Sequence, residues 1–255
     1  MCYQAGYCRV ASFLWNIFYE NGFEFVAHAG NHRWIRRQRI RVTVLKWAEA
    51  DKSSAESDDD CYDQCVRLRK ARMFLHDNSN PEYPLLALND VFIGESHAAR
   101  VSYYDVQIDD GPVMRQKSSG LTVCTGTGST SWNYNINRVS EQHICELLSI
   151  MKDMSLLTAN STADNSTREI CKRFNEKLLF DPQCTTMAFT VRDPVFNLTF
   201  PAGTQRGFAK RIRVKSRCTN AHIILDGSVS VPFNSGTEVL LQIHDSDALR
   251  SIVLP

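Results

Sequence analysis

One short stretch, residues 117–132, limits what this chain can fold into more than any other part. It reads Lys-Ser-Ser-Gly-Leu-Thr-Val-Cys-Thr-Gly-Thr-Gly-Ser-Thr-Ser-Trp. Its segment Leu121–Cys124 is short, apolar and β-branched, which predicts a strand. The small residues 125–131 follow and are closed by Trp132, so the strand is expected to run into a tight turn. The fold must therefore place a strand end and a polar turn together.

The composition of this turn suits a polar ligand. Gly126 and Gly128 would let a ligand come against the main chain, and hydroxyls with backbone N–H groups would face its polar atoms. The hydroxyls belong to Thr125, Thr127, Ser129, Thr130 and Ser131. A solvated turn is the alternative interpretation. Neither common phosphate motif fits, because Ser131 stands at the third glycine position of a dinucleotide fingerprint and no Gly-Lys-Ser/Thr follows.

Composition excludes several classes of function. With 255 residues, 43% of them hydrophobic, the chain is large enough to bury a core as one domain or two. A net charge of +1 gives no reason to expect nucleic acid or a membrane surface as partner. No apolar run approaches the length of a membrane-spanning helix. The cysteines number nine and are scattered, which indicates reduced thiols. Cys61 and Cys65 lack two further ligands at metal spacing, so no metal is assigned.

The first part of the chain falls into two segments. In residues 1–46, the apolar run from Val10 to Phe18 predicts an amphipathic or buried helix. The alternation in residues 39–44 predicts a half-buried strand with a solvated cationic face, and a nucleic-acid patch is the alternative. Residues 47–80 are polar, with an acidic run at residues 58–60, and predict a linker.

Residues 81–255 predict a mainly β domain. A β meander is expected over residues 87–93, 102–108 and 120–124, with a hairpin turn at 109–112. Apolar residues at helical spacing predict helices over residues 137–154 and 166–179. Further strands are expected over residues 187–191, 195–200, 212–216, 222–225 and 239–243, with a turn at 234–236. The expected fold class is therefore α+β, mainly β, with two or so inserted helices.

Three motifs in order resemble the NAD kinase family, in its animal mitochondrial type. They are residues 117–132, the upstream sequence Leu-Asn-Asp-Val-Phe-Ile-Gly-Glu at 88–95, and Asp226-Gly227. The resemblance runs from about residue 81 to residue 255, with a weaker part over 32–42. It implies that residues 81–255 are the substrate-binding domain and that residues 1–46 are a remnant of the family's N-terminal α/β domain, so that the chain is N-terminally truncated.

The resemblance also implies an activity. NAD kinases transfer the γ-phosphoryl group of ATP, with Mg²⁺, to the 2′-hydroxyl of the adenosine ribose of NAD, giving NADP. The implied ligands are NAD and ATP, the implied assembly is a homodimer, and the implied compartment is the mitochondrion. The chain has no convincing presequence, so the cytoplasm is the alternative compartment.

Several residues match family positions that bind nucleotide. Asn89 and Asp90 match the pair that holds the ribose region, where an amide and a carboxylate suit vicinal hydroxyls. An Asx turn is their alternative role. The other expected nucleotide-binding residues are Thr125, Thr127, Gly128, Ser129, Thr130, Ser131, Trp132, Asp226 and Gly227. For Asp226 and Gly227 a structural turn is the alternative, and Cys124 is expected to be a core residue rather than a nucleophile.

One family motif is missing from this sequence. The family's Gly-Gly-Asp-Gly, whose aspartate acts as base toward the 2′-hydroxyl, does not occur in the 255 residues. Asp90 is the remaining candidate for a catalytic carboxylate. Two functions therefore stay open: an NAD kinase, or a catalytically inactive nucleotide-binding or dimerisation module.

Overall fold

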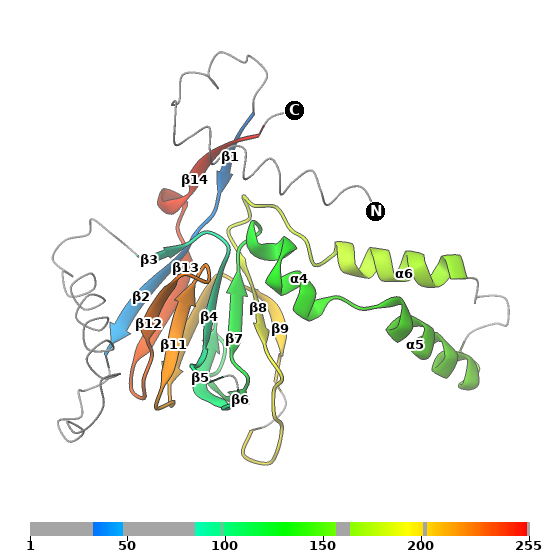
Figure 1. Cartoon of the computed structure of the whole chain (residues 1–255), viewed down its shortest axis with the longest axis horizontal. Helices are drawn as coiled ribbons and strands as arrows, with labels where there is room; N and C mark the ends of the chain where they lie inside the picture. Colours follow the sequence, from blue (N-terminus) through cyan, green and yellow to red (C-terminus); the bar gives the residue numbers. More distant parts are fainter. Residues whose placement is uncertain (1–32, 48–84, 98, 157–163, 201–202, 254–255) are drawn as a thin grey trace. The chain divides into compact units, whose positions relative to one another are not determined.

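A computed structural model describes residues 33–47, 85–97, 99–156, 164–200 and 203–253 (Figure 1). The chain divides into two compact units, residues 36–249 and residues 1–35 with 250–255. In the smaller unit, the described residues belong to a two-stranded sheet of β1 (Arg33–Arg37) and β14 (Leu249–Val253). The expected helix at residues 10–18, and the expected linker with Cys61 and Cys65, lie outside the described residues.

The larger unit is built from two six-stranded sheets. The first has the order β3-β2-β13-β10-β5-β6, and the second has the order β12-β11-β4-β7-β8-β9. Every neighbouring pair in both sheets is antiparallel. The strands of the first sheet are β3 (Leu85–Ala87), β2 (Ile40–Lys46), β13 (Glu238–Ile243), β10 (Arg211–Ser216), β5 (Ser102–Ile108) and β6 (Met114–Ser118). Those of the second are β12 (Val229–Pro232), β11 (Ala221–Leu225), β4 (Asp90–Glu95), β7 (Leu121–Cys124), β8 (Met187–Val191) and β9 (Arg206–Ala209).

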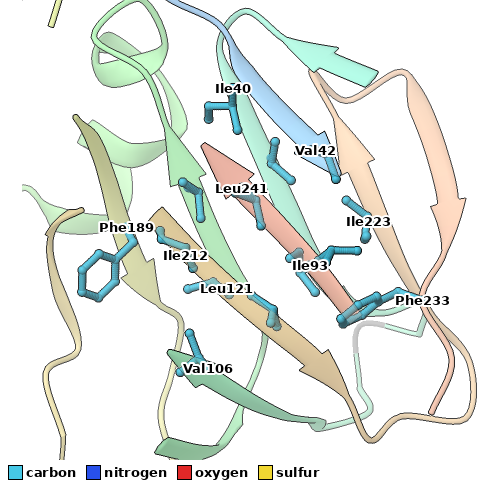
Figure 2. Packing of buried hydrophobic residues seen from close by; sticks show 14 of the residues in the cluster. Ile40, Val42, Ile93, Val106, Leu121, Phe189, Ile212, Ile223, Phe233 and Leu241 are labelled. Atoms are coloured by element: carbon cyan, nitrogen blue, oxygen red, sulfur yellow. The ribbon is translucent and has the colours of Figure 1, made fainter. Parts of the chain in front are cut away.

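The two sheets share one hydrophobic core, which Figure 2 shows from close by. Strand β10 illustrates how its side chains are sorted: Ile212 and Val214 are fully buried, while Arg211, Arg213 and Lys215 are exposed. Because successive side chains of a strand point to opposite faces, this alternation places one face in the core and the other in solvent. The predicted half-buried strand at 39–44 is confirmed in the same way, since β2 buries Ile40 and Val42.

The middle of the second sheet is covered on both faces. All residues of β7 and β8 are buried, which is expected when another layer packs on the outer face of a sheet. Helix α4 (Trp132–Asn137) contacts β7 directly. Helices α5 (Glu141–Asp153) and α6 (Asp164–Glu176) pack against each other. No helix among the described residues is long and apolar enough to cross a membrane.

The α+β fold class is confirmed, and so are the predicted strands at 102–108, 187–191, 212–216, 222–225 and 239–243 to within one residue. The hairpin turn after residue 108 is confirmed, as is the turn at 234–236, where Thr237 N–H donates to the carbonyl of Asn234. Strands β6, β9, β12 and β14 were not expected. Strand β2, from the expected N-terminal segment, is hydrogen-bonded between β3 and β13.

Three predictions were wrong. The meander does not form, because β4 and β7 pair in one sheet whereas β5 and β6 pair in the other. The strand expected at 195–200 is absent from this described segment, because the Asn197 side chain accepts from the N–H groups of Thr199 and Phe200 and folds the backbone into a turn. The start of the helix expected over 137–154 was wrong, since α5 begins at Glu141, where the Ser140 hydroxyl accepts from His143 N–H and caps it; helix α4 before it was not expected.

Candidate functional site

The loop at Leu88 and Asn89 is the first part of the site, and it interrupts the strand expected over residues 87–93. Strand β3 ends before it and β4 begins after it. The Asp226 carboxylate accepts hydrogen bonds from the backbone N–H groups of Leu88, Asn89 and Asp90, at 2.8, 2.7 and 3.1 Å. One charged side chain thus fixes three consecutive peptide groups of the loop, as an N-cap carboxylate does at a helix start.

Asp226 reaches the loop from the turn between β11 and β12. Both Asp226 and Gly227 have positive φ angles, of 48° and 67°, and both are exposed. The backbone N–H of Asp226 also donates to the carbonyl of Asp90, at 2.9 Å. These two residues therefore form a structural turn, which is the alternative role that the sequence left open for them, and Asp226 holds the loop at Leu88 and Asn89.

The second part of the site is the turn after β7, where a short 3₁₀ helix spans Gly128–Thr130. Thr125 joins the two parts, because its N–H donates to Asn89 O at 2.9 Å and its hydroxyl donates to Leu88 O at 2.6 Å. The Ser129 hydroxyl donates to Gly126 O at 2.7 Å. Thr125 and Ser129 are fully buried, so these two hydroxyls hold the turn together and are not available to a ligand.

Both glycines of the turn are needed by the chain's own backbone. A Cβ on Gly128 would lie 2.2 Å from Asn89 O, and one on Gly126 would lie 2.1 Å from Asp181 O. Neighbouring backbone fills the space in which a side chain would lie, so both positions require glycine whether or not a ligand is bound. Their function is to let three chain segments meet at one place.

A smaller set of polar side chains remains for a ligand. Thr130 and Ser131 are exposed and Asn89 is half-buried. Within the described part of the chain, none of these three side chains forms a hydrogen bond, whereas Thr127 accepts from Arg37 at 3.4 Å. Their donors and acceptors are therefore not used by the protein itself and are available to polar atoms of a ligand.

Asp90 is the titratable group of the site. Its carboxylate has no hydrogen-bond partner among the described residues, and burial, with a smaller contribution from the charge of Asp226, raises its pKa. A raised pKa makes a carboxylate a stronger proton acceptor. Cys124, its cross-strand neighbour, is buried, and burial raises the pKa of that thiol to about 12. Cys124 therefore stays a neutral core residue, as the sequence predicted.

An aromatic and cationic cluster lies at the end of the turn. The rings of Trp132 and Phe92 are 5.3 Å apart, and the Arg192 guanidinium lies 5.3 Å from the Trp132 ring centre. Arg192 forms no ion pair with any described residue. The sequence showed Arg192 only as one of several strand arginines, because nothing in its neighbours indicates that it stacks on a tryptophan 60 positions away.

The described residues contain no group of three or more His, Cys, Asp or Glu side chains that could hold a metal ion. Asp226 already accepts three backbone hydrogen bonds, so Asp90 is the one free carboxylate that the described residues place beside the loop. A Mg²⁺ ion is usually bound through one or two carboxylates together with substrate phosphates. The residues present do not build such a site by themselves.

Comparison with known proteins finds relatives that share one name. No family model matches the chain. NAD kinase 2, mitochondrial, of Homo sapiens is 37% identical over 235 residues, which are 89% of this chain and 52% of that protein. The protein of the same name in Xenopus tropicalis is 36% identical over an alignment of 252 positions, which covers 89% of this chain and 58% of that protein. The chain thus spans about half the length of these curated relatives, whose names agree with the family that the motifs indicate.

Two further similarities are weaker. A bacterial NAD kinase of Marinomonas sp. is 49% identical over 47 residues, or 18% of this chain and 16% of that protein. A solved structure of yeast NADH kinase complexed with NADH gives a TM-score of 0.47 at 13% identity, covering 87% of this chain and 45% of that one. At that TM-score the structural likeness carries no argument.

Proposed function

We propose that the chain belongs to the NAD kinase family, takes part in the ATP-dependent phosphorylation of NAD to NADP, and supplies the NAD-binding side of the site. One observation carries the proposal. The two motif segments meet through the bond from Thr125 N–H to Asn89 O and leave Asn89, Thr130 and Ser131 free to bind. The convergence of the two motifs places these three polar side chains at one place on the protein, where one ligand could reach all of them.

Each group at the site has a proposed role. The Asn89 amide and the Asp90 carboxylate bind ribose hydroxyls, which offer both donors and acceptors. Thr130 and Ser131 bind further polar atoms of the adenosine. Trp132 offers an aromatic face to a ring, and the unpaired guanidinium of Arg192 offers charge to a phosphate. Asp226 positions Asn89 and Asp90 and does not itself contact the ligand.

The transfer needs one proton to be removed from the substrate. The 2′-oxygen of NAD forms a bond to the γ-phosphorus of ATP, the bond from that phosphorus to the leaving oxygen of ADP breaks, and the 2′-hydroxyl proton goes to a base. Asp90 is the proposed acceptor, because its raised pKa favours proton uptake. ATP and Mg²⁺ follow from the family resemblance. No step is assigned to the metal, because the described residues do not form a site for it.

The cellular compartment and the oligomeric state of the protein are also proposals. Mitochondrial relatives at 33–37% identity favour the mitochondrion as compartment. A homodimer and the domain boundaries at residues 46 and 80 remain predictions from the resemblance, and so do nucleotide contacts of Thr127, Gly128 and Gly227.

A calorimetric titration of the full chain with NAD tests the binding site. We expect weak, saturable binding in about the millimolar range, because fewer contacts must offset the loss of freedom on association. Thr130→Val should weaken binding by about three- to tenfold, which corresponds to one lost hydrogen bond. Thr219→Val, at an exposed position far along the chain, is the matched control. A folded chain that releases no heat with NAD would contradict the proposal and favour an inactive dimerisation module.

NADP formation with ATP and Mg²⁺ tests the chemistry. We expect turnover by residues 1–255 to be low, because the family's aspartate motif is absent from the sequence and a general base typically contributes about 10²- to 10⁴-fold. Any turnover that remains should fall further in Asp90→Asn. Turnover that is fast and unchanged in Asp90→Asn would show that Asp90 is not the base.

A further inference from the structure

A cavity of about 300 Å³ opens between helix α4, the end of helix α6 and strands β8 and β9. None of the residues of the proposed NAD site lines it. Small-molecule sites usually start at about this size, and they combine apolar walls with a few placed polar groups. The cavity has both features.

The floor of the cavity is one face of a strand pair. Ala188 lies opposite Phe208 and Thr190 lies opposite Arg206 in the register of β8 and β9. Because side chains alternate along a strand, these four residues share the face that the helices cover. Ala188 is small and buried, so it leaves space above it.

The polar end of the cavity is held in place by a network. The Asn137 amide donates to the Thr190 hydroxyl and to Asn133 O, both at 2.9 Å. Asn133 and Thr190 are buried. Side chains that bind one another in this way keep their positions, so this wall is built before any ligand arrives.

The rim carries aromatic rings and positive charge. The Arg206 guanidinium lies 5.4 Å from the Phe174 ring centre, and Phe208 packs edge-to-face on Phe180 at 5.1 Å. Lys177 lies on the same rim. Neither Arg206 nor Lys177 forms an ion pair with a residue that the structure describes.

We propose that this cavity binds a small amphipathic anion, a flat or short apolar body with one carboxylate. The body lies over Ala188 between the phenylalanine rings, and the carboxylate meets the Arg206 guanidinium, whose fork matches two carboxylate oxygens. Lys177 adds a second positive charge nearby. The apolar walls exclude fully polar anions, and the cations select against neutral compounds of the same shape.

Benzoate and its neutral analogue benzamide test the site on the full chain by two-dimensional NMR. We expect saturable shifts of the residues that line the cavity, with a dissociation constant for benzoate of about 1 mM and binding of benzamide at least about tenfold weaker. Arg206→Gln should weaken benzoate binding by about tenfold and leave benzamide unchanged. Lys215→Gln, which removes one exposed positive charge from a strand of the other sheet, is the matched control.

A second variant tests the space rather than the charge. Ala188→Leu should fill the floor and abolish binding of both compounds while the spectrum stays that of a folded protein. Equal binding of benzoate and benzamide, shifts outside the cavity, or unchanged affinity in Arg206→Gln would each overturn the proposal.

Discussion

Replacement of Asp226 by alanine should loosen the loop that carries Asn89 and Asp90. The wild-type carboxylate accepts three backbone hydrogen bonds, of 2.7, 2.8 and 3.1 Å. A buried hydrogen bond to a charged group contributes about 1.5–3 kcal/mol. Asp226 is exposed, so water replaces much of what is lost, and the nearer comparison is a lost helix N-cap at about 0.5–2 kcal/mol.

We therefore expect Asp226→Ala to lower the free energy of unfolding by about 1–2 kcal/mol. For a protein of this size, that corresponds to a fall in Tm of about 2–8 °C. Asp226→Asn should cost less, because its amide oxygen can still accept the two bonds, from Asn89 and Asp90, that one carboxylate oxygen accepts in the wild type. Asp110→Ala is the control, since it removes an equally exposed aspartate whose ion pair with Arg211 is a surface contact of little value.

The substitution of Asp226 should also change the pKa of Asp90. The charge of Asp226 is the smaller of two causes that raise the pKa of Asp90. In Asp226→Asn, an NMR titration of the Asp90 carboxyl should give a pKa lower than in the wild type but still above its ordinary value, because burial remains. If Asp226→Ala and Asp110→Ala melt at the same temperature and the Asp90 titration does not move, Asp226 does not hold the loop.

Three other substitutions give distinct outcomes. Gly128→Ala places a methyl group 2.2 Å from Asn89 O and should destabilise the protein by about 3 kcal/mol, and an unchanged urea midpoint would contradict the packing. Burial raises the pKa of Asp90, so the folded state holds its proton more tightly, and stability falls as pH rises above about 4. The free energy of unfolding of Asp90→Asn should therefore increase relative to that of the wild type as the pH rises from roughly 3 to 7. If urea unfolding gives the same difference between the two proteins over this whole range, the reasoning is refuted. A hydrogen bond from Arg41 lowers the pKa of Asp247, so its stabilisation is present above about pH 4 and is lost as pH falls through the lowered value. Asp247→Asn should lower the free energy of unfolding by about 1–2 kcal/mol at neutral pH and by less in acid. An equal loss at neutral and acid pH would exclude the ion pair with Arg41 as the cause.

Local patterns predicted the strands well and their pairing poorly. Alternation over residues 39–44 and 212–216 placed β2 and β10 correctly, because one face of each is in solvent. The edge strand β9 was missed because Arg206–Ala209 is short and carries an exposed arginine and phenylalanine. The meander prediction failed because pairing depends on which distant strands compete for each edge, and no local pattern contains that information.

The sequence indicated which segments form the candidate site, but not which of their hydroxyls hold the turn together. The resemblance treats residues 88–95 and 117–132 as motifs of one family, and the bond between Thr125 and Asn89 joins them in the structure. Composition does not distinguish a hydroxyl that holds a turn from one that binds a ligand, since that depends on what lies opposite. Ser129 and Thr130 are adjacent and chemically alike, yet one is fully buried and the other is exposed.

The place of β2 between β3 and β13 has a consequence for synthesis of the chain. Arg41 on β2 and its partner Asp247 lie 206 positions apart. At about 5–20 residues per second, a ribosome takes roughly 10 to 40 s to cover that distance. During this time the apolar side chains Ile40 and Val42 lack the strand that will cover them, and such a segment is prone to associate with other nascent chains. Arg39 and Arg41 flank them, and charges next to an apolar strand oppose that association. The arginines that bind Asp247 in the folded protein thus also protect the chain before it has folded.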